Sequence, residues 1–392
     1  MEFSLLEMAA IAIALDEEEA EARTKKNQVK RKWSVHPLWR RRQFDGEFNT
    51  LCRYLPDNED KVFGYFRISK ENFDILLNEL KPALTRQQSR FKTPIEPKQR
   101  LAVCLRYLAT GDSYLTISFS FRLGHTTVHQ IVNSTCRAIV NVLMKKVMPQ
   151  PSEDNWKLIA HDFETLWKFP NCFGALDGKH FVIEAPPNSG SIFYNYKNTF
   201  SIILLALVDA RYKFITVNIG SYGRNSDGGV FAKSSLGQRL ENGTLSLPAG
   251  RQLPNSDIIA PFVIVADEAF PLKTYIMRPY PGSQTIEDAA KTYFNYRLTL
   301  ARRLVEYCFL RRIEMAPKNV DNVILAACTL HNFLRNQNDV AFTPRNTEQS
   351  ISEFRQSMLD QLRPQHHGQS TNDAFAVREK FKNYFLSPAG YF

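Results

Sequence analysis

Four apolar, strand-like runs in the middle of the chain most constrain its fold. They occupy residues 173–185, 200–210, 213–220 and 261–269, and a helix-like stretch over residues 226–240 separates the third from the fourth. Three strands, a helix and a further strand are typical of an α/β core. The last run is apolar over residues 262–266, as in a strand that is covered on both faces. We therefore predict an α/β core.

Three acidic residues stand at notable places in this pattern. Asp177 lies within the first run, Asp267 directly follows the apolar part of the fourth, and Glu306 lies in an arginine-rich helical stretch over residues 292–313. Ligands of such sheets commonly bind near strand ends. Two strands and a late helix would let the three carboxylates converge on one site.

Each acid also has a structural interpretation. Asp177-Gly178 is a dipeptide of tight hairpin turns, so Asp177 could belong to a turn. Asp267 could cap a helix or end a strand, and Glu306 could pair with an arginine of its own helix.

Convergent carboxylates would require compensation by cations. Three buried anions either hold metal or take up protons, and carboxylate oxygens are the ligands that Mg²⁺ and Mn²⁺ prefer. The formal net charge of +10 and the pI near 9.2 favour a polyanionic partner. These features suggest a metal-dependent enzyme that acts on nucleic acid.

Length and cysteine usage define the class of protein. A chain of 392 residues with 44% hydrophobic content is expected to form two or more domains. The six cysteines are scattered without zinc-site spacing, which indicates reduced, mostly buried thiols. The apolar run over residues 5–15 is too short to cross a bilayer, so we expect an intracellular protein without a membrane anchor.

Charge is segregated near the N-terminus. An acidic block over residues 16–21 precedes a basic cluster that contains Trp33 and Trp39. The cluster suits nuclear import or phosphate contact, and the alternative is a solvated, disordered leader. Its cations are Lys25, Lys26, Lys30, Arg31, Lys32, Arg40, Arg41 and Arg42.

Residues 63–148 have a helical pattern, with Ser69 as an expected N-cap. Within it, a short helix, a turn at residues 123–125 and a threonine-rich helix make a helix-turn-helix candidate. The alternative is an ordinary corner between packed helices. The residues that would face a major groove are Thr126, Thr127, His129 and Gln130.

The C-terminal third is predicted to be helical over residues 292–313 and 319–336, with a last helix over residues 376–384. The polar composition between them predicts a flexible segment. The expected organisation is a disordered leader (1–45), a helical DNA-binding-like domain (46–150), a catalytic domain (160–335), a flexible linker (336–373) and a C-terminal helix and tail (374–392).

An ordered set of motifs resembles a known family. It runs through GALDGKHFVIEAP, YNYKNTFSIILLALVDARYKFITVNIGSYGRNSDGGVF, VADEAFPL, RLTLARRLVE and ILAACTLHNFL to the VREKFKNYFLSPAG tail. The set is similar to the PIF/Harbinger transposases and the host nucleases derived from them. The resemblance implies an RNase H-like mixed-sheet core of the α/β class, joined to an N-terminal helical domain.

By motif position, the resemblance implies a catalytic and metal-binding triad of Asp177, Asp267 and Glu306. Asp227 matches a further acid of the family, for which we expect a supporting or helix-capping role. His180 would touch substrate or lie in the core. The implied cofactor is Mg²⁺ or Mn²⁺.

The resemblance further implies cleavage of DNA phosphodiesters by water, with Arg302 and Arg303 as DNA contacts. It also implies a partner with a Myb/SANT-like domain and a nuclear location, with the cytoplasm left open as a second one. The alternative is a domesticated DNA-binding or scaffold protein without turnover, because the basic segment that follows Glu306 in the family is shortened here. An RNA-directed nuclease would share the metal chemistry. The DNA site and the oligomeric state stay open.

Overall fold

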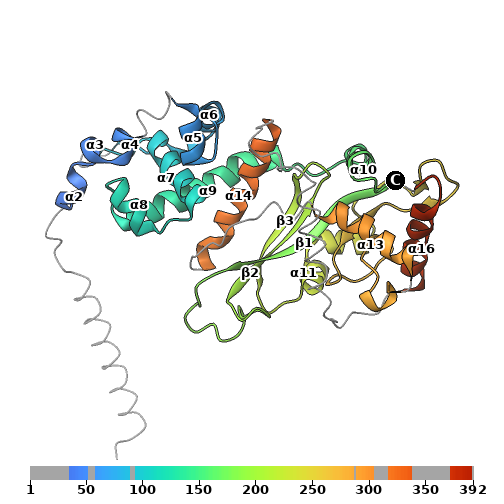
Figure 1. Ribbon diagram of the computed structural model, residues 1–392. Coiled ribbons are helices and arrows are strands. Elements are labelled where there is room, and N and C mark those ends of the chain that lie inside the picture. Colours follow the sequence, from blue (N-terminus) through green and yellow to red (C-terminus); the bar gives the residue numbers. More distant parts are fainter. Residues whose placement is uncertain are drawn as a thin grey trace, which may run out of the picture.

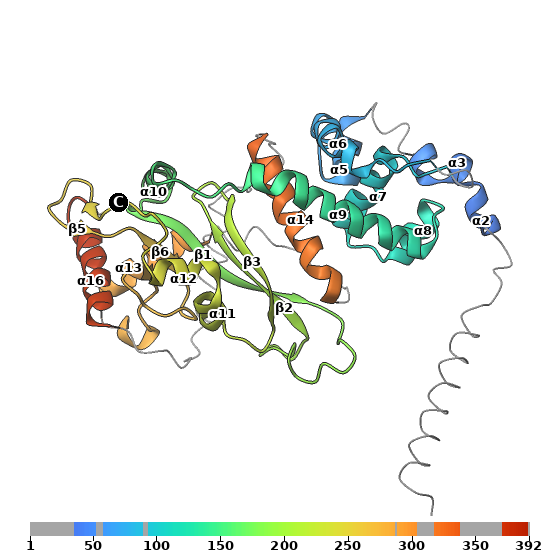
Figure 2. The same cartoon turned by 180° about the vertical axis from the view of Figure 1, so that it is seen from behind.

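The structure is a computed structural model that describes residues 35–51, 58–88, 93–286, 288–303, 317–337 and 371–390. Helices come first in the chain, strands occupy its middle, and helices close it (Figures 1 and 2). The helices are α2 (Pro37–Arg40), α3 (Arg42–Asp45), α4 (Glu47–Thr50), α5 (Glu59–Phe66), α6 (Lys70–Leu84), α7 (Pro97–Thr110), α8 (Tyr114–Ser120), α9 (His125–Val147), α10 (Glu153–Trp167), α11 (Asp227–Lys233), α12 (Ser235–Glu241), α13 (Ala289–Arg302), α14 (Pro317–Asn336) and α16 (Asn372–Leu386). The strands are β1 (Cys172–Val182), β2 (Ser201–Val208), β3 (Phe214–Tyr222), β4 (Arg251–Gln252), β5 (Ile259–Ala260), β6 (Val263–Ala266) and β7 (Ile276–Met277). Of the described helices, none combines the length and apolar composition that crossing a membrane requires.

Five strands form one mixed sheet in the order β3-β2-β1-β6-β7. The first three strands pair antiparallel, whereas β6 joins β1 in parallel and β7 joins β6 in parallel. The four predicted strand runs are β1, β2, β3 and β6, and every residue of β6 is buried as predicted. The expectation of an RNase H-like α/β core is confirmed by this mixed sheet with its flanking helices.

The sheet is the middle layer of three. Side chains alternate along each strand, so Leu205 and Leu207 of β2 face one side while Leu204 and Val208 face the other. Helices α10, α11 and α12 contribute Trp156, Phe231 and Leu240 to the first side. Helices α13, α14 and α16 pack on the second side. Both faces of β2 and β6 are therefore buried, which explains why these two strands are almost wholly apolar.

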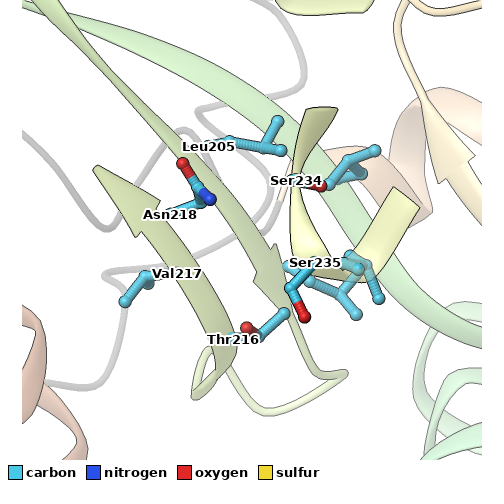
Figure 3. Close-up of a pocket in the computed structure, with 9 residues that line it drawn as sticks. Leu205, Thr216, Val217, Asn218, Ser234 and Ser235 are labelled. Carbon is cyan, nitrogen blue, oxygen red and sulfur yellow. The ribbon is translucent and has the colours of Figure 1, made fainter. Parts of the chain in front are cut away.

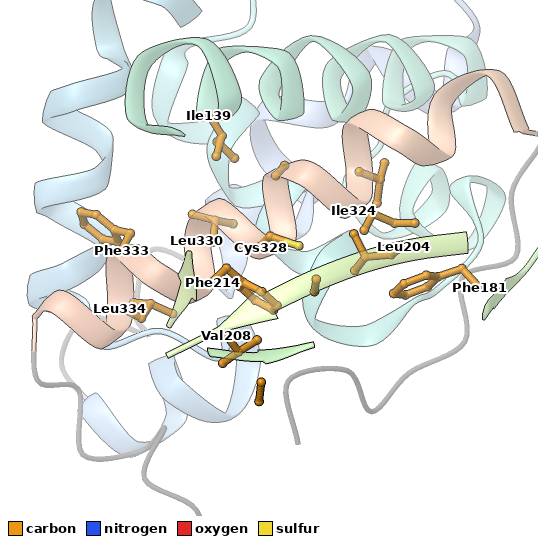
Figure 4. Packing of buried hydrophobic residues seen from close by; sticks show 14 of the residues in the cluster. Ile139, Phe181, Leu204, Val208, Phe214, Ile324, Cys328, Leu330, Phe333 and Leu334 are labelled. Carbon is orange, nitrogen blue, oxygen red and sulfur yellow. The ribbon is translucent and has the colours of Figure 1, made fainter. Parts of the chain in front are cut away.

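Helix α14 joins the N-terminal helices to the sheet. It packs along α9 on one side and against β3 on the other. Figure 4 shows Ile324 and Leu330 of α14 between Ile139 of α9 and Leu204 of β2. One continuous hydrophobic core consequently runs from α5 and α6 through α14 to the sheet.

Predictions about individual helices and cysteines were confirmed in part. The Ser69 hydroxyl accepts a hydrogen bond from the backbone N–H of Asn72, so the N-cap of α6 is confirmed. The helix predicted over residues 226–240 is interrupted at Ser234, whose hydroxyl caps α12. The four described cysteines, Cys104, Cys136, Cys172 and Cys328, are free and buried, as predicted.

The boundary of the predicted disordered leader is wrong. Residues 37–45 form α2 and α3, because the His36 ring caps the first turn, Pro37 sets the backbone for it, and Trp39 contacts Phe119 of α8. Residues 1–34, with their acidic block and five of the eight cations, lie outside the described residues, as do residues 338–370 of the predicted linker. The last helix is longer than predicted, since it begins at Asn372 after the Thr371 cap.

Asn332 makes the polar connection within this core. Its side chain is 1% exposed, its Oδ1 accepts from the backbone N–H of Phe214, and its Nδ2 donates to the carbonyls of Phe214 and Val147. These bonds link α14 to the start of β3 and the end of α9. A buried backbone group that loses its partner pays its full desolvation cost.

Asn332→Ala is therefore expected to lower the free energy of unfolding by about 1–3 kcal/mol, because it leaves buried backbone groups of Phe214 and Val147 without partners. Urea denaturation followed by circular dichroism measures the change. Asn336→Ala, at an exposed position of the same helix, is the matched control and should be nearly neutral. Equal effects of the two substitutions would contradict the prediction.

Candidate active site at the end of two parallel strands

The pairing of β1 with β6 brings two carboxylates together. The parallel register sets Leu176 opposite Ala266, the last residue of β6. The next residue of each strand is acidic, Asp177 in β1 and Asp267 after β6. Both are partly exposed. The two carboxylates thus occupy neighbouring positions at the carboxyl end of β6.

Asp177 does not form a hairpin turn. Strand β1 continues through it, with Asp177 opposite Ala206 and Gly178 opposite Leu205 of β2. Because Leu176 packs on the α11 side of the sheet, alternation places Asp177 on the side that α13 and α14 cover. The turn interpretation of this dipeptide is therefore wrong.

Asp267 does end its strand in a turn. Its Oδ1 accepts a hydrogen bond from the backbone N–H of Ala269 at 3.0 Å. Such a bond orients the carboxylate. The strand-end interpretation and a site role are thus compatible for this residue.

Asp227 approaches the site from the other face of the sheet. It is the first residue of α11, and a Cβ built on Gly178 would lie only 2.2 Å from its Oδ1. That oxygen is buried without a hydrogen-bond partner. Burial, followed by the charge of Asp267, raises the pKa of Asp227 to about 6, while the charge of Lys197 opposes the rise. The predicted capping role is wrong, because the Ser226 hydroxyl caps α11 by accepting from the N–H of Gly229.

A fourth acid, Glu268, was missed from the sequence, although it directly follows Asp267. Burial and the charge of Asp267 raise its pKa, and the charges of Arg278 and Arg302 oppose the rise. Arg302 is the last residue of α13, so this helix ends near the carboxyl end of β6. Glu306, the third residue of the predicted triad, lies outside the described residues, as does the shortened segment after it.

The residues present suit a divalent cation. The donors are carboxylate oxygens, which match Mg²⁺ and Mn²⁺, and the orphaned oxygen of Asp227 lies in a field that Asp267 makes more negative. Within the part of the chain that the structure describes, no group of three or more histidine, cysteine or acidic side chains is arranged to hold a metal. Asp177 and Asp267 are therefore the described members of the predicted ligand set.

The helix-turn-helix candidate is built by α7, α8 and α9, which contact one another. The left-handed residue of its turn is Arg122 (φ 52°), whereas Gly124 has an ordinary φ of −66°. Thr126 and Gln130 are exposed on α9 and Thr127 is partly exposed. His129 is partly exposed; its ring contacts Tyr114 and its Nε2 lies 3.1 Å from Nδ2 of Asn319 on α14, so its DNA-contacting role stays a prediction.

The two arginines after α13 differ in exposure. Arg302 is partly exposed, whereas Arg303 is only 5% exposed. Arg303 is a correction to the DNA-contacting set, since packing encloses its side chain. Arg302 retains an open surface beside the acidic group.

A cavity of about 50 Å³ lies elsewhere, between β2, β3 and the junction of α11 with α12 (Figure 3). Its polar lining comes from Thr216, Asn218, Ser234 and Ser235. It contains no ionisable side chain, so the carboxylates at the end of β6 are the stronger candidate for chemistry.

Comparison with known proteins identifies similarity in the region that contains Asp177 and Asp267. Residues 176–332 match the family model described as DDE superfamily endonuclease. The chain contains a DDE superfamily endonuclease domain. That domain begins one residue before Asp177 and ends at Asn332 on α14. The resemblance to Harbinger-derived nucleases is confirmed by this match and by the relatives.

The chain is similar along most of its length to several curated proteins. It is 27% identical to "Protein ALP1-like" of Arabidopsis thaliana, over 79% of this chain and 83% of that protein. It is 24% identical to the Arabidopsis protein "Antagonist of like heterochromatin protein 1", over 71% and 74% of the two chains. It is 21% identical to the mouse "Putative nuclease HARBI1", over 72% and 80%. No solved structure matches the chain.

The close packing of Asp227 on Gly178 in the DDE domain gives a direct test. Gly178→Ala is expected to lower the free energy of unfolding by about 1–3 kcal/mol, because the new methyl group overlaps the Asp227 carboxylate. Adding Asp227→Ala removes the overlap and should restore most of the loss, which a double-mutant cycle by urea denaturation measures.

Gly64→Ala serves as the control for this pair, since nothing lies within 4 Å of a Cβ at that position. It should leave stability unchanged or slightly higher, because alanine favours a helix interior. A cost of Gly178→Ala that is the same with and without Asp227→Ala would show that the two residues do not interact.

Proposed function

We propose that this protein is a divalent-metal-dependent DNA nuclease of the Harbinger type that works in the nucleus. The observation that carries the proposal is the parallel register of β1 and β6, which makes Asp177 and Asp267 neighbours at the end of a buried strand. The DDE endonuclease domain begins at this point of the chain. Helix α13 leads toward Glu306 from the same side of the sheet as Asp177.

Each acidic residue has a defined role in this proposal. Asp177, Asp267 and Glu306 bind Mg²⁺ or Mn²⁺ through carboxylate oxygens. When bound, the ions supply Lewis-acid activation of water and stabilisation of the leaving oxygen. The turn at Asp267 orients its carboxylate, and Asp227 adds negative charge behind the ligands.

DNA is the substrate that the charge of the chain favours, because the net charge is +10 although the site itself is acidic. Thr126 and Gln130 would meet a groove from the exposed face of α9, and Arg302, whose charge acts on Glu268, would contact a phosphate. A partner with a Myb/SANT-like domain belongs to the same proposal. Such a partner would supply further DNA recognition.

A non-catalytic scaffold is the second candidate. Two observations favour it: the segment after Glu306 is shorter than the family pattern, and one relative is named for antagonism to a heterochromatin protein rather than for cleavage. A DDE fold that has lost turnover would keep its DNA-binding surface. The cleavage experiment below separates the two candidates.

The purified chain is expected to nick duplex DNA in the presence of Mg²⁺ or Mn²⁺ and to stop when the metal is chelated. Asp177→Asn, Asp267→Asn and Glu306→Gln should each lower the nicking rate by on the order of hundredfold or more, because each removes a charged metal ligand. Gel analysis of supercoiled plasmid, with and without a Myb/SANT partner, measures the rate.

Asp154→Asn is the matched control, since it removes one exposed carboxylate from α10 and should cut at the wild-type rate. Calorimetric titration with Mn²⁺ adds a readout that does not require activity. Equal residual nicking by wild type and all three variants, with DNA binding intact, would reject the nuclease and leave the scaffold.

Added negative charge tests whether the exposed face of α9 contacts DNA. Thr126→Glu with Gln130→Glu should weaken binding to duplex DNA at least several-fold, because two carboxylates would then face the phosphates. Fluorescence anisotropy with a labelled duplex measures the affinity. Gln87→Glu with Gln88→Glu adds the same charge at exposed positions after α6 and is the control. Equal weakening by both pairs would indicate a net-charge effect and no specific role for α9.

A further inference from the structure

The loop between β1 and β2 is a built structure with an exposed tip. In Figure 1 this loop (green) projects beyond the end of the sheet. The Asn195 side chain, 4% exposed, organises the tip: its Oδ1 accepts from the N–H groups of Lys197 and Thr199 and from the Thr199 hydroxyl. Its Nδ2 donates to Oγ of Ser201, the first residue of β2. The tip is thus closed by hydrogen bonds.

Two side chains with affinity for nucleic acid stand on this tip. Tyr196 is 73% exposed, although aromatic rings are usually covered. Its ring lies nearly perpendicular to that of His180 of β1, with centroids 5.5 Å apart, and the Lys197 ammonium lies over it, 5.3 Å from its centroid. His180 is itself held by Ser201, at 2.9 Å from Nδ1 to Oγ. The ring is therefore oriented by neighbours and still open to solvent.

The tip lies close to the acidic group. Burial, together with the charge of Lys197, lowers the pKa of His180 to about 4, so this ring is neutral. The same lysine charge opposes the rise in the pKa of Asp227. Asp227 packs on Gly178, the residue after Asp177. Lys197 consequently stands near both the aromatic ring and Asp227, on the face of the sheet opposite to Asp177.

The rim of the loop carries further positive charge. The backbone N–H of Arg224 donates to the carbonyl of Ile192 in this loop, and the Arg224 residue is exposed. Two further rings on this surface are exposed, Tyr194 of the same loop at 42% and Tyr222 of β3 at 47%. Exposed cations together with open aromatic rings suit a polyanion with stacking bases.

We propose that Tyr196 and Lys197 bind one unpaired nucleotide of the DNA strand on the Asp227 side of the candidate site, the ring stacking on the base and the ammonium contacting a phosphate. That the bound strand is DNA rests on the proposed function. Bases within a duplex already stack on each other, so only an unpaired or extruded nucleotide offers a free face to the ring. Tyr196 and Lys197 are accordingly substrate-positioning residues.

The experiment measures binding without cleavage, with the full chain in chelator. The probes are two labelled duplexes of the same mixed sequence, one blunt and one with a single-stranded tail, followed by fluorescence anisotropy. Tyr196→Ala should weaken binding of the tailed duplex roughly tenfold and leave the blunt duplex unchanged. Tyr196→Phe should bind like wild type, because stacking requires the ring and not the hydroxyl.

Lys197→Gln should make the salt dependence of tailed-duplex binding shallower by about 0.7 in log-log slope, as expected for one lost phosphate contact on a single strand. Phe375→Ala and Lys380→Gln on α16 are matched controls with an exposed ring and an exposed cation. Circular dichroism and the midpoint of thermal unfolding should stay at the wild-type values in all variants, since each changed side chain is exposed.

Wild-type affinity of Tyr196→Ala for the tailed duplex would overturn the proposal, and so would equal losses on both probes or no binding of the tail by the wild-type chain. Because no cleavage is measured, the outcome is separable from the nicking assay. If Tyr196→Ala loses binding to the tailed duplex while the wild-type chain does not nick DNA, the nucleotide site is supported and the nuclease is rejected. If Tyr196→Ala binds the tailed duplex normally and the wild-type chain nicks DNA, the nucleotide site is rejected and the nuclease is supported.

Discussion

The parallel pairing of β1 with β6 is the interaction on which the site depends. The two strands are far apart in the chain, and their register alone makes Asp177 and Asp267 neighbours. A shift of one residue would send Asp177 to the opposite face of the sheet and separate it from the side that α13 covers. That register is held by dry packing on both faces, because all four residues of β6 are buried. The relative positions of Asp177 and Asp267 therefore depend on the packing of the buried strands that carry them.

Helix α14 extends the same dependence to the N-terminal half. The endonuclease domain ends on this helix, yet its apolar side chains are buried between α9 and the sheet. Asn332 bonds to both neighbours at once. A domain cut at the limits of the family match would expose one side of α14. The helical half is consequently part of the folded unit that carries the site, and the exposed face of α9 keeps a defined relation to the carboxylates.

Much of the fold could be predicted from the sequence, because local patterns encode it. Apolar runs predicted the four long strands, and Ser69 predicted the start of α6. The two-residue strands and the break at Ser234 could not be predicted, since they depend on tertiary contacts. Of the candidate site, Asp177 and Asp267 were recognised from motifs, whereas the contact of His129 with Asn319 could not be predicted because the two residues are remote in the chain. Lys197 gave no signal, because only the folding back of its loop brings it near Asp227.

The charges around the site explain how an acidic centre can serve a polyanionic substrate. Asp177, Asp227, Asp267 and Glu268 would repel a phosphate if nothing compensated them. The charge of Lys197 opposes the rise in the pKa of Asp227, and the charges of Arg278 and Arg302 oppose the rise in the pKa of Glu268. These cations flank the acids rather than replace the metal, because the Asp227 oxygen beside Gly178 remains without a hydrogen-bond partner. A divalent cation among the carboxylates and phosphates beside Lys197 and Arg302 would satisfy both sets of charges together, whereas Arg278 is buried and compensates Glu268 from within.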